Sequence, residues 1–142
     1  MKKKTKKPIF DKRAPGGKMI VYGAVLVIIG GVINSYWAWK YALVGLSGAV
    51  QTSDVMGYTV VLCLQAAMSL IIALDGINNR NRPSKGRKVM FNALCVLALA
   101  VILIVQGSSA GDTNIVAAIS MAGSIMMFIG GLKNRKVFGN GK

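Results

Sequence analysis

Four apolar blocks, each about as long as a membrane-spanning helix, dominate this sequence. They lie at about 19–43, 55–77, 89–106 and 114–132. A helix needs about 20 apolar residues to cross about 30 Å of hydrocarbon. A soluble all-α core would instead repeat its apolar residues at helix period, although the 54% hydrophobic content alone fits either class. The sequence therefore predicts an all-α membrane protein with a four-helix transmembrane domain over residues 19–132.

The basic residues predict which way the helices run. All 18 Lys and Arg residues except Lys40 fall before the first block, in the loop 78–88 or after the fourth block. Lys and Arg collect in cytoplasmic loops, and a four-span topology puts these three segments on one side. We therefore expect cytoplasmic N- and C-termini, with 1–18 a disordered basic tail, 133–142 a second basic tail, a basic central cytoplasmic loop and short outer loops. The compact chain favours a multi-pass protein of a bacterial plasma (inner) membrane.

The net charge of +14 also suggests a polyanionic partner. The N-terminal basic run lacks aromatic interleaving and a recognition fold, so no nucleic acid is expected to bind. Anionic lipid head groups explain the charge more simply, because each cation near an anionic leaflet contributes about 1 kcal/mol. The residues predicted to make this contact lie in the central loop: Arg80, Arg82, Lys85, Arg87 and Lys88.

Aromatic residues mark the outer end of the first block. We interpret Trp37, Trp39 and Lys40 as interface anchors, because aromatic rings gather at the membrane surface and a lysine there can extend to water. A choline-type cation box is the alternative. The best small-residue site, 47–49, lies too far beyond the block for signal cleavage, so an uncleaved first span is expected.

Three neutral polar residues lie deep in three different blocks. At about 1.5 Å of rise per residue, Asn34 is about 22 Å from the inner face, and Gln65 and Ser120 are each about 18 Å from it. An unsatisfied amide in hydrocarbon costs several kcal/mol, so these side chains should face inward and find partners. This polar layer of Asn34, Gln65 and Ser120 either holds the helices together or lines a path for a polar substrate or ion.

Small residues predict where the helices pack, because they allow close backbone approach in lipid. On the second block four of them share one helical stripe: Ala66, Ser69, Ala73 and Gly76. On the fourth block, contacts are expected at Ala118, Ala122 and Gly123. The third block lacks such a stripe and is predicted to face lipid. Asp112 is the expected cap of the fourth helix.

Little in this chain can support catalysis. It contains no His and no Glu. Cys63 and Cys95 differ in depth by about 12 Å, which is too far for a disulfide. Asp75 is the one acidic residue inside a block, and it lies near the cytoplasmic end, where Arg80 or Arg82 can pair with it. We predict no enzyme activity, no catalytic residue, no cofactor and no metal site, and no family motif is recognisable.

Three functions fit these observations. The first is a non-catalytic accessory or scaffold subunit that packs against a larger membrane assembly. The second is a homo-oligomeric pore or small carrier lined by the polar layer, including a holin-like pore. The third is an immunity-type protein that protects against a membrane-active toxin. All three involve the lipid bilayer and either a membrane-protein partner or self-association.

Overall fold

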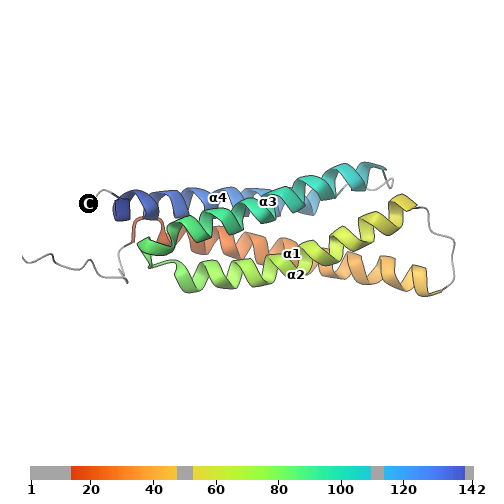
Figure 1. Ribbon diagram of the computed structural model, residues 1–142. Coiled ribbons are helices and arrows are strands. Elements are labelled where there is room, and N and C mark those ends of the chain that lie inside the picture. The colour runs from red at the N-terminus through yellow and green to blue at the C-terminus, as the bar shows by residue number, and fades with distance from the viewer. Residues whose placement is uncertain (1–13, 48–52, 110–113, 140–142) are drawn as a thin grey trace, which may run out of the picture.

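The computed structural model describes residues 14–47, 53–109 and 114–139, and this part of the chain folds into four long helices (Figure 1). All four are long and apolar enough to cross a membrane, which confirms the fold class at that level. A short 3-10 turn, η1 (Pro83–Lys85), precedes the third helix. The helices are α1 (Gly17–Leu46), α2 (Ser53–Asn79), α3 (Gly86–Ser109) and α4 (Ile115–Gly139).

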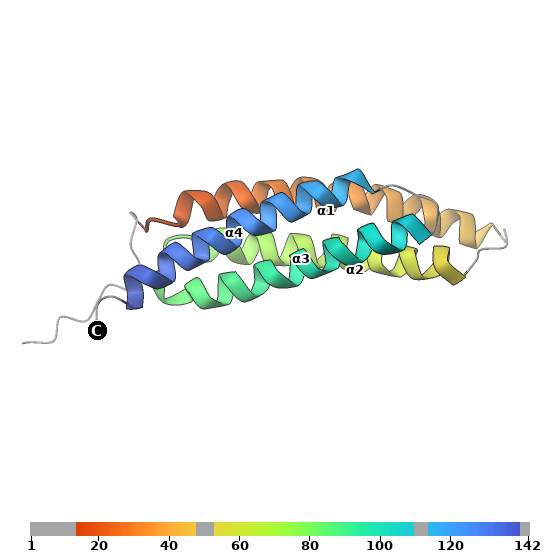
Figure 2. The same cartoon turned by 90° about the horizontal axis from the view of Figure 1, so that it is seen from above.

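The helices form an antiparallel bundle in which each packs against two neighbours. α1 and α3 each contact both α2 and α4, and Figure 2 shows α4 running beside α1 and α3. The start of α1, the α2–α3 connection and the end of α4 lie together at the left of Figure 1. We call this the basic end, because it carries all the described Lys and Arg residues except Lys40: Lys18, Arg80, Arg82, Lys85, Arg87, Lys88, Lys133, Arg135 and Lys136.

Each helix extends beyond the apolar block that predicted it. The second basic segment, predicted as a tail from residue 133, is helical as far as Gly139. Hydropathy identifies only the apolar part of a helix, which suits hydrocarbon. Lys, Arg and Asn can continue the same helix into water. Residues 1–13 and 140–142 of the predicted tails lie outside the described residues, as do 48–52 and 110–113 of the predicted outer loops.

The core consists of two apolar clusters separated by the polar layer. The cluster nearer the basic end draws on all four helices and comprises Ile20, Ala24, Val27, Ile72, Ala73, Val89, Ala93, Val96 and Met127. The second cluster comprises Ala38, Tyr58, Leu62, Ala100, Leu103 and Ala117. Asn34, Gln65 and Ser120 lie between the two clusters along their helices.

Glycines bring α1 and α4 into backbone contact. A Cβ atom placed on Gly123 would lie 2.6 Å from the Gly23 carbonyl oxygen, and the reciprocal contact is also too short for a side chain. A Cβ on Gly130 would lie 2.8 Å from the Gly16 oxygen. Gly16, Gly23 and Gly30 follow one another at heptad spacing, which keeps glycines on the face of α1 that packs against α4. We call this contact the α1–α4 seam.

The third helix also turns small residues toward the interior. The sequence analysis identifies no stripe of small residues on this helix. Gly86, Ala93, Ala100 and Gly107 are buried at heptad spacing. A Cβ on Gly86 would lie 2.6 Å from the Gly131 oxygen, so α3 and α4 also approach closely. The small residues of this stripe are seven residues, or two turns, apart. They therefore differ from the pattern of small residues one turn apart that predicts close packing on the other helices. α3 is still the least buried helix, at 28% of its most apolar stretch against 39% in each of the others.

Asn134 joins three helices at the basic end. Its Oδ1 accepts the Gly16 N–H at 2.8 Å, and its Nδ2 donates to the Arg80 carbonyl oxygen at 3.0 Å. The Asn134 side chain is fully buried. An asparagine inside a basic segment resembles part of a solvated tail, so nothing in the sequence pattern marks this residue as core.

Candidate functional site

The three residues of the polar layer are joined by hydrogen bonds. Asn34 Nδ2 donates to Gln65 Oε1 at 3.0 Å, and Gln65 Nε2 donates to Ser120 Oγ at 3.0 Å. All three side chains are 0% exposed. One chain of hydrogen bonds therefore links α1, α2 and α4, with Gln65 at its centre.

Two residues that the sequence analysis missed extend this layer. Asn114 Nδ2 donates to Asn34 Oδ1 at 3.3 Å and to the Tyr58 hydroxyl at 2.9 Å. Its Oδ1 accepts the Ala117 N–H at 2.9 Å, so Asn114 also caps α4. Asp112, the predicted cap, lies outside the described residues. The available signal was the position of Asn114 at the start of the last apolar block, where capping asparagines are common.

Close packing surrounds the layer. Gly30 lies against the Ser120 hydroxyl, and a Cβ placed on Gly31 would lie 2.8 Å from the Ser69 Cβ. Tyr58 is fully buried next to the layer and packs edge-to-face on Tyr41, with ring centroids 5.5 Å apart. The hydrogen-bonding groups thus face one another across a packed interior.

The layer contains amide and hydroxyl groups, which donate and accept hydrogen bonds but carry no charge. Among the described residues, two buried side-chain oxygens have no hydrogen-bond partner, Ser69 Oγ and Gln106 Oε1. Within the same ranges, no group of three His, Cys, Asp or Glu side chains could hold a metal ion. Cys63 is exposed and Cys95 half-buried, and both are free thiols.

The structure separates the predicted packing residues into two sets. Buried residues include the whole α2 stripe and one α4 position: Ala66, Ser69, Ala73, Gly76 and Gly123. Ala118 and Ala122 are exposed on the outside of the bundle, so the contact predicted at these two residues stays a prediction. Each lies two residues from Ser120, which is about 200° around a helix, and the buried Ser120 therefore turns both outward.

Asp75 pairs with neither of the two cations that the sequence suggested. Its Oδ1 accepts from Lys88 Nζ at 2.6 Å and from Asn79 Nδ2 at 3.1 Å, and its Oδ2 accepts from Asn92 Nδ2 at 3.0 Å. Arg80 instead donates to the Ile77 carbonyl oxygen at 3.0 Å. The carboxylate therefore holds α2 to α3 near the basic end, where an ion pair so close to water contributes little net stability.

The remaining basic side chains of the central loop are exposed: Arg80, Arg82, Lys85 and Arg87. Lys88 is half-exposed and bonded to Asp75. At the opposite end of the bundle, Trp39 is 63% exposed. Lys40 Nζ lies 5.2 Å from the ring centre of Trp37, within cation–π range. These contacts form between neighbours on one helix and do not enclose a cavity for a cationic ligand.

Comparison with protein-family models, curated proteins and solved structures finds no match to this chain.

Proposed function

We propose that this chain is a non-catalytic accessory or scaffold subunit of a larger membrane assembly. One observation carries the proposal: the side chains of the polar layer bond to one another, so the layer is held by its own hydrogen bonds and does not present an open polar path to a substrate. In lipid such bonds stabilise helix association by about 0.6 kcal/mol each. The function of such a bundle resides in its outer surface.

The proposal includes the orientation of the protein in a bacterial plasma membrane, with the basic end in the cytoplasm. The sorting of all described Lys and Arg residues except Lys40 to one end supports this orientation, because cytoplasmic segments carry the excess of such residues. The exposed Trp39 and the Lys40 above its aromatic neighbours suit the opposite interface.

The alternative is a homo-oligomeric pore or small carrier, including a holin-like pore. A path through a single chain would need the polar layer to be open, whereas Asn34, Gln65 and Ser120 are fully buried. A pore between copies would need a helix face that allows close approach. Ala118 and Ala122, exposed one turn apart on α4, form such a face.

Ion flux through the purified protein separates the two functions. In liposomes loaded with a fluorescent ion indicator, we expect this chain to give the same leak rate as empty liposomes. In bacteria, its induced expression should leave the membrane potential intact. Ala118→Leu/Ala122→Leu, which blocks close approach at the exposed α4 face, should then change neither readout.

A leak that the wild-type chain produces and the double variant abolishes would establish the pore and overturn the accessory role. If no leak is found, purification from the native membrane should give a stoichiometric complex with a larger membrane protein. If protection against a membrane-active toxin is found instead, the immunity-type function replaces the accessory role.

A further inference from the structure

A cavity of about 270 Å³ opens at the basic end, between the start of α1 and the end of α2. Its lining combines cationic, polar and apolar side chains: Gly17, Lys18, Val21, Tyr22, Arg80 and Asn81. Gly17 lies close to the residues that follow α2. A Cβ on Gly17 would lie 3.1 Å from Asn81 Oδ1 and 3.2 Å from the Arg80 carbonyl oxygen. The α2 terminus can therefore come close to α1 without filling the cavity.

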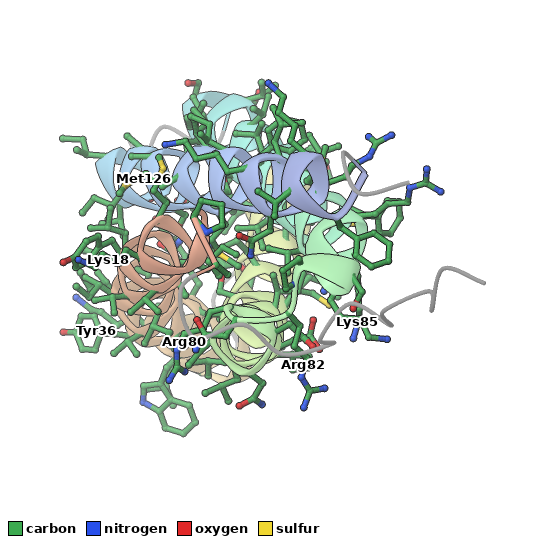
Figure 3. The ribbon with its side chains drawn as sticks, turned by 90° about the vertical axis from the view of Figure 1, so that its left-hand side faces the viewer. Lys18, Tyr36, Arg80, Arg82, Lys85 and Met126 are labelled. Carbon is green, nitrogen blue, oxygen red and sulfur yellow. The ribbon has the colours of Figure 1, made fainter. Side chains whose placement is uncertain are left out.

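This cavity is positively charged. Lys18 and Arg80 are both exposed at its rim, and none of the described residues that line it is acidic. In Figure 3, Lys18 lies on the outer side of α1 and Arg80 lies between α1 and α2, whereas Lys85 lies across α2 from them. One guanidinium N–H of Arg80 is held by the Ile77 carbonyl oxygen at 3.0 Å, which leaves its other donors for a ligand. The carboxylate of Asp75, near the end of α2, is bonded to Lys88.

An exposed apolar strip continues from the cavity toward the other end of the bundle. On α1, Val25 and Val32 follow Lys18 at heptad spacing, and both are exposed. On α2, Leu74 and Ala67 precede Asn81 at the same spacing and are also exposed. The strip reaches a second cavity of about 390 Å³, with a lining that includes Trp39, Ala67 and Leu70.

We propose that the Lys18–Arg80 cavity binds the phosphate group of an anionic phospholipid, whose acyl chains lie along the α1–α2 strip. Basic pockets between helices on the cytoplasmic side suit phospholipid head groups, and a guanidinium beside an ammonium suits a phosphate oxygen cluster. The apolar strip favours a lipid over a soluble phosphate, because only the lipid has acyl chains that can contact it. The proposal depends on the membrane placement of the helices and holds whether or not the chain is an accessory subunit.

Native mass spectrometry of the full chain in a neutral detergent tests this site, with phosphatidylglycerol as the probe and phosphatidylcholine as the zwitterionic reference. Lys18→Gln/Arg80→Gln should weaken phosphatidylglycerol binding about 30-fold, the fold-change for losing two cations at about 1 kcal/mol each. The matched control is Lys85→Gln/Arg87→Gln, which removes the same charge from the far side of the basic end and should bind as the wild type does. Lys18→Arg/Arg80→Lys keeps both charges and should retain binding.

Two results would overturn the lipid site. Equal losses in the cavity variant and the control variant would mean diffuse attraction to the basic end. Competition by inorganic phosphate at the concentration of the lipid would mean a soluble anion as the ligand. All four exchanged side chains are exposed, and an unchanged gel-filtration profile will show that each variant is folded.

Discussion

Gly23→Val is expected to leave almost no folded protein in the membrane. A Cβ on Gly23 would meet the Gly123 carbonyl oxygen and lie 2.7 Å from the Met127 amide nitrogen. Both are backbone atoms, so the only relief is to move α4 away from α1 along the α1–α4 seam. Overpacking costs about 1–3 kcal/mol where side chains can yield, and more is expected here, against a total stability of about 5–15 kcal/mol.

The measurement is the yield of monodisperse protein after detergent extraction, together with its thermal midpoint. Gly57→Val is the matched control, because a Cβ on Gly57 meets no atom within 4 Å. The two variants add the same atoms to two helices. Equal yields from both would show that the α1–α4 seam does not hold the bundle together.

Gln65→Leu is expected to lower the free energy of unfolding by about 1–3 kcal/mol. Gln65 makes both hydrogen bonds that connect the polar layer, so its loss leaves Asn34 Nδ2 and Ser120 Oγ buried without these partners. Gln106→Leu is the matched control. The Oε1 of Gln106 is buried without a hydrogen bond, so this substitution removes no hydrogen bond made by that oxygen.

Unfolding in detergent, followed by the thermal midpoint, gives the comparison between these glutamine variants. We expect a lower midpoint for Gln65→Leu than for Gln106→Leu. A Gln65→Leu protein with wild-type stability that has lost its cellular activity would identify the layer as a ligand path, contrary to the accessory function.

The position of a residue along the bundle could be predicted from the sequence, because the rise per residue is fixed once the ends of the apolar blocks are known. This rise puts Asn34, Gln65 and Ser120 in one layer, and the structure joins them by hydrogen bonds. The four spans were identified in the same way, since their length follows from the thickness of the hydrocarbon.

The side chains that face the interior of the bundle were harder to predict than the positions of residues along it. Ala118 and Ala122 satisfy the same small-residue pattern as Ser120, and only the position of the neighbouring helices decides which set is buried. The heptad spacing of small residues on α1 and α3 was the signal for the faces on which the helices pack. Partners at the helix ends are also undetermined by sequence, because several cations lie within reach of Asp75 and only the α2–α3 contact selects Lys88.

The most direct test of the account is the accessibility of single cysteines in intact bacteria. In a chain with Cys63 and Cys95 replaced by Ala, one new cysteine is introduced at Ser84, Ser109 or Gly141 and treated with a membrane-impermeant thiol reagent. Ser109→Cys should be labelled, whereas Ser84→Cys and Gly141→Cys should react only after the membrane is opened. Labelling of Ser84→Cys in sealed cells would contradict the four-span arrangement with its basic end in the cytoplasm.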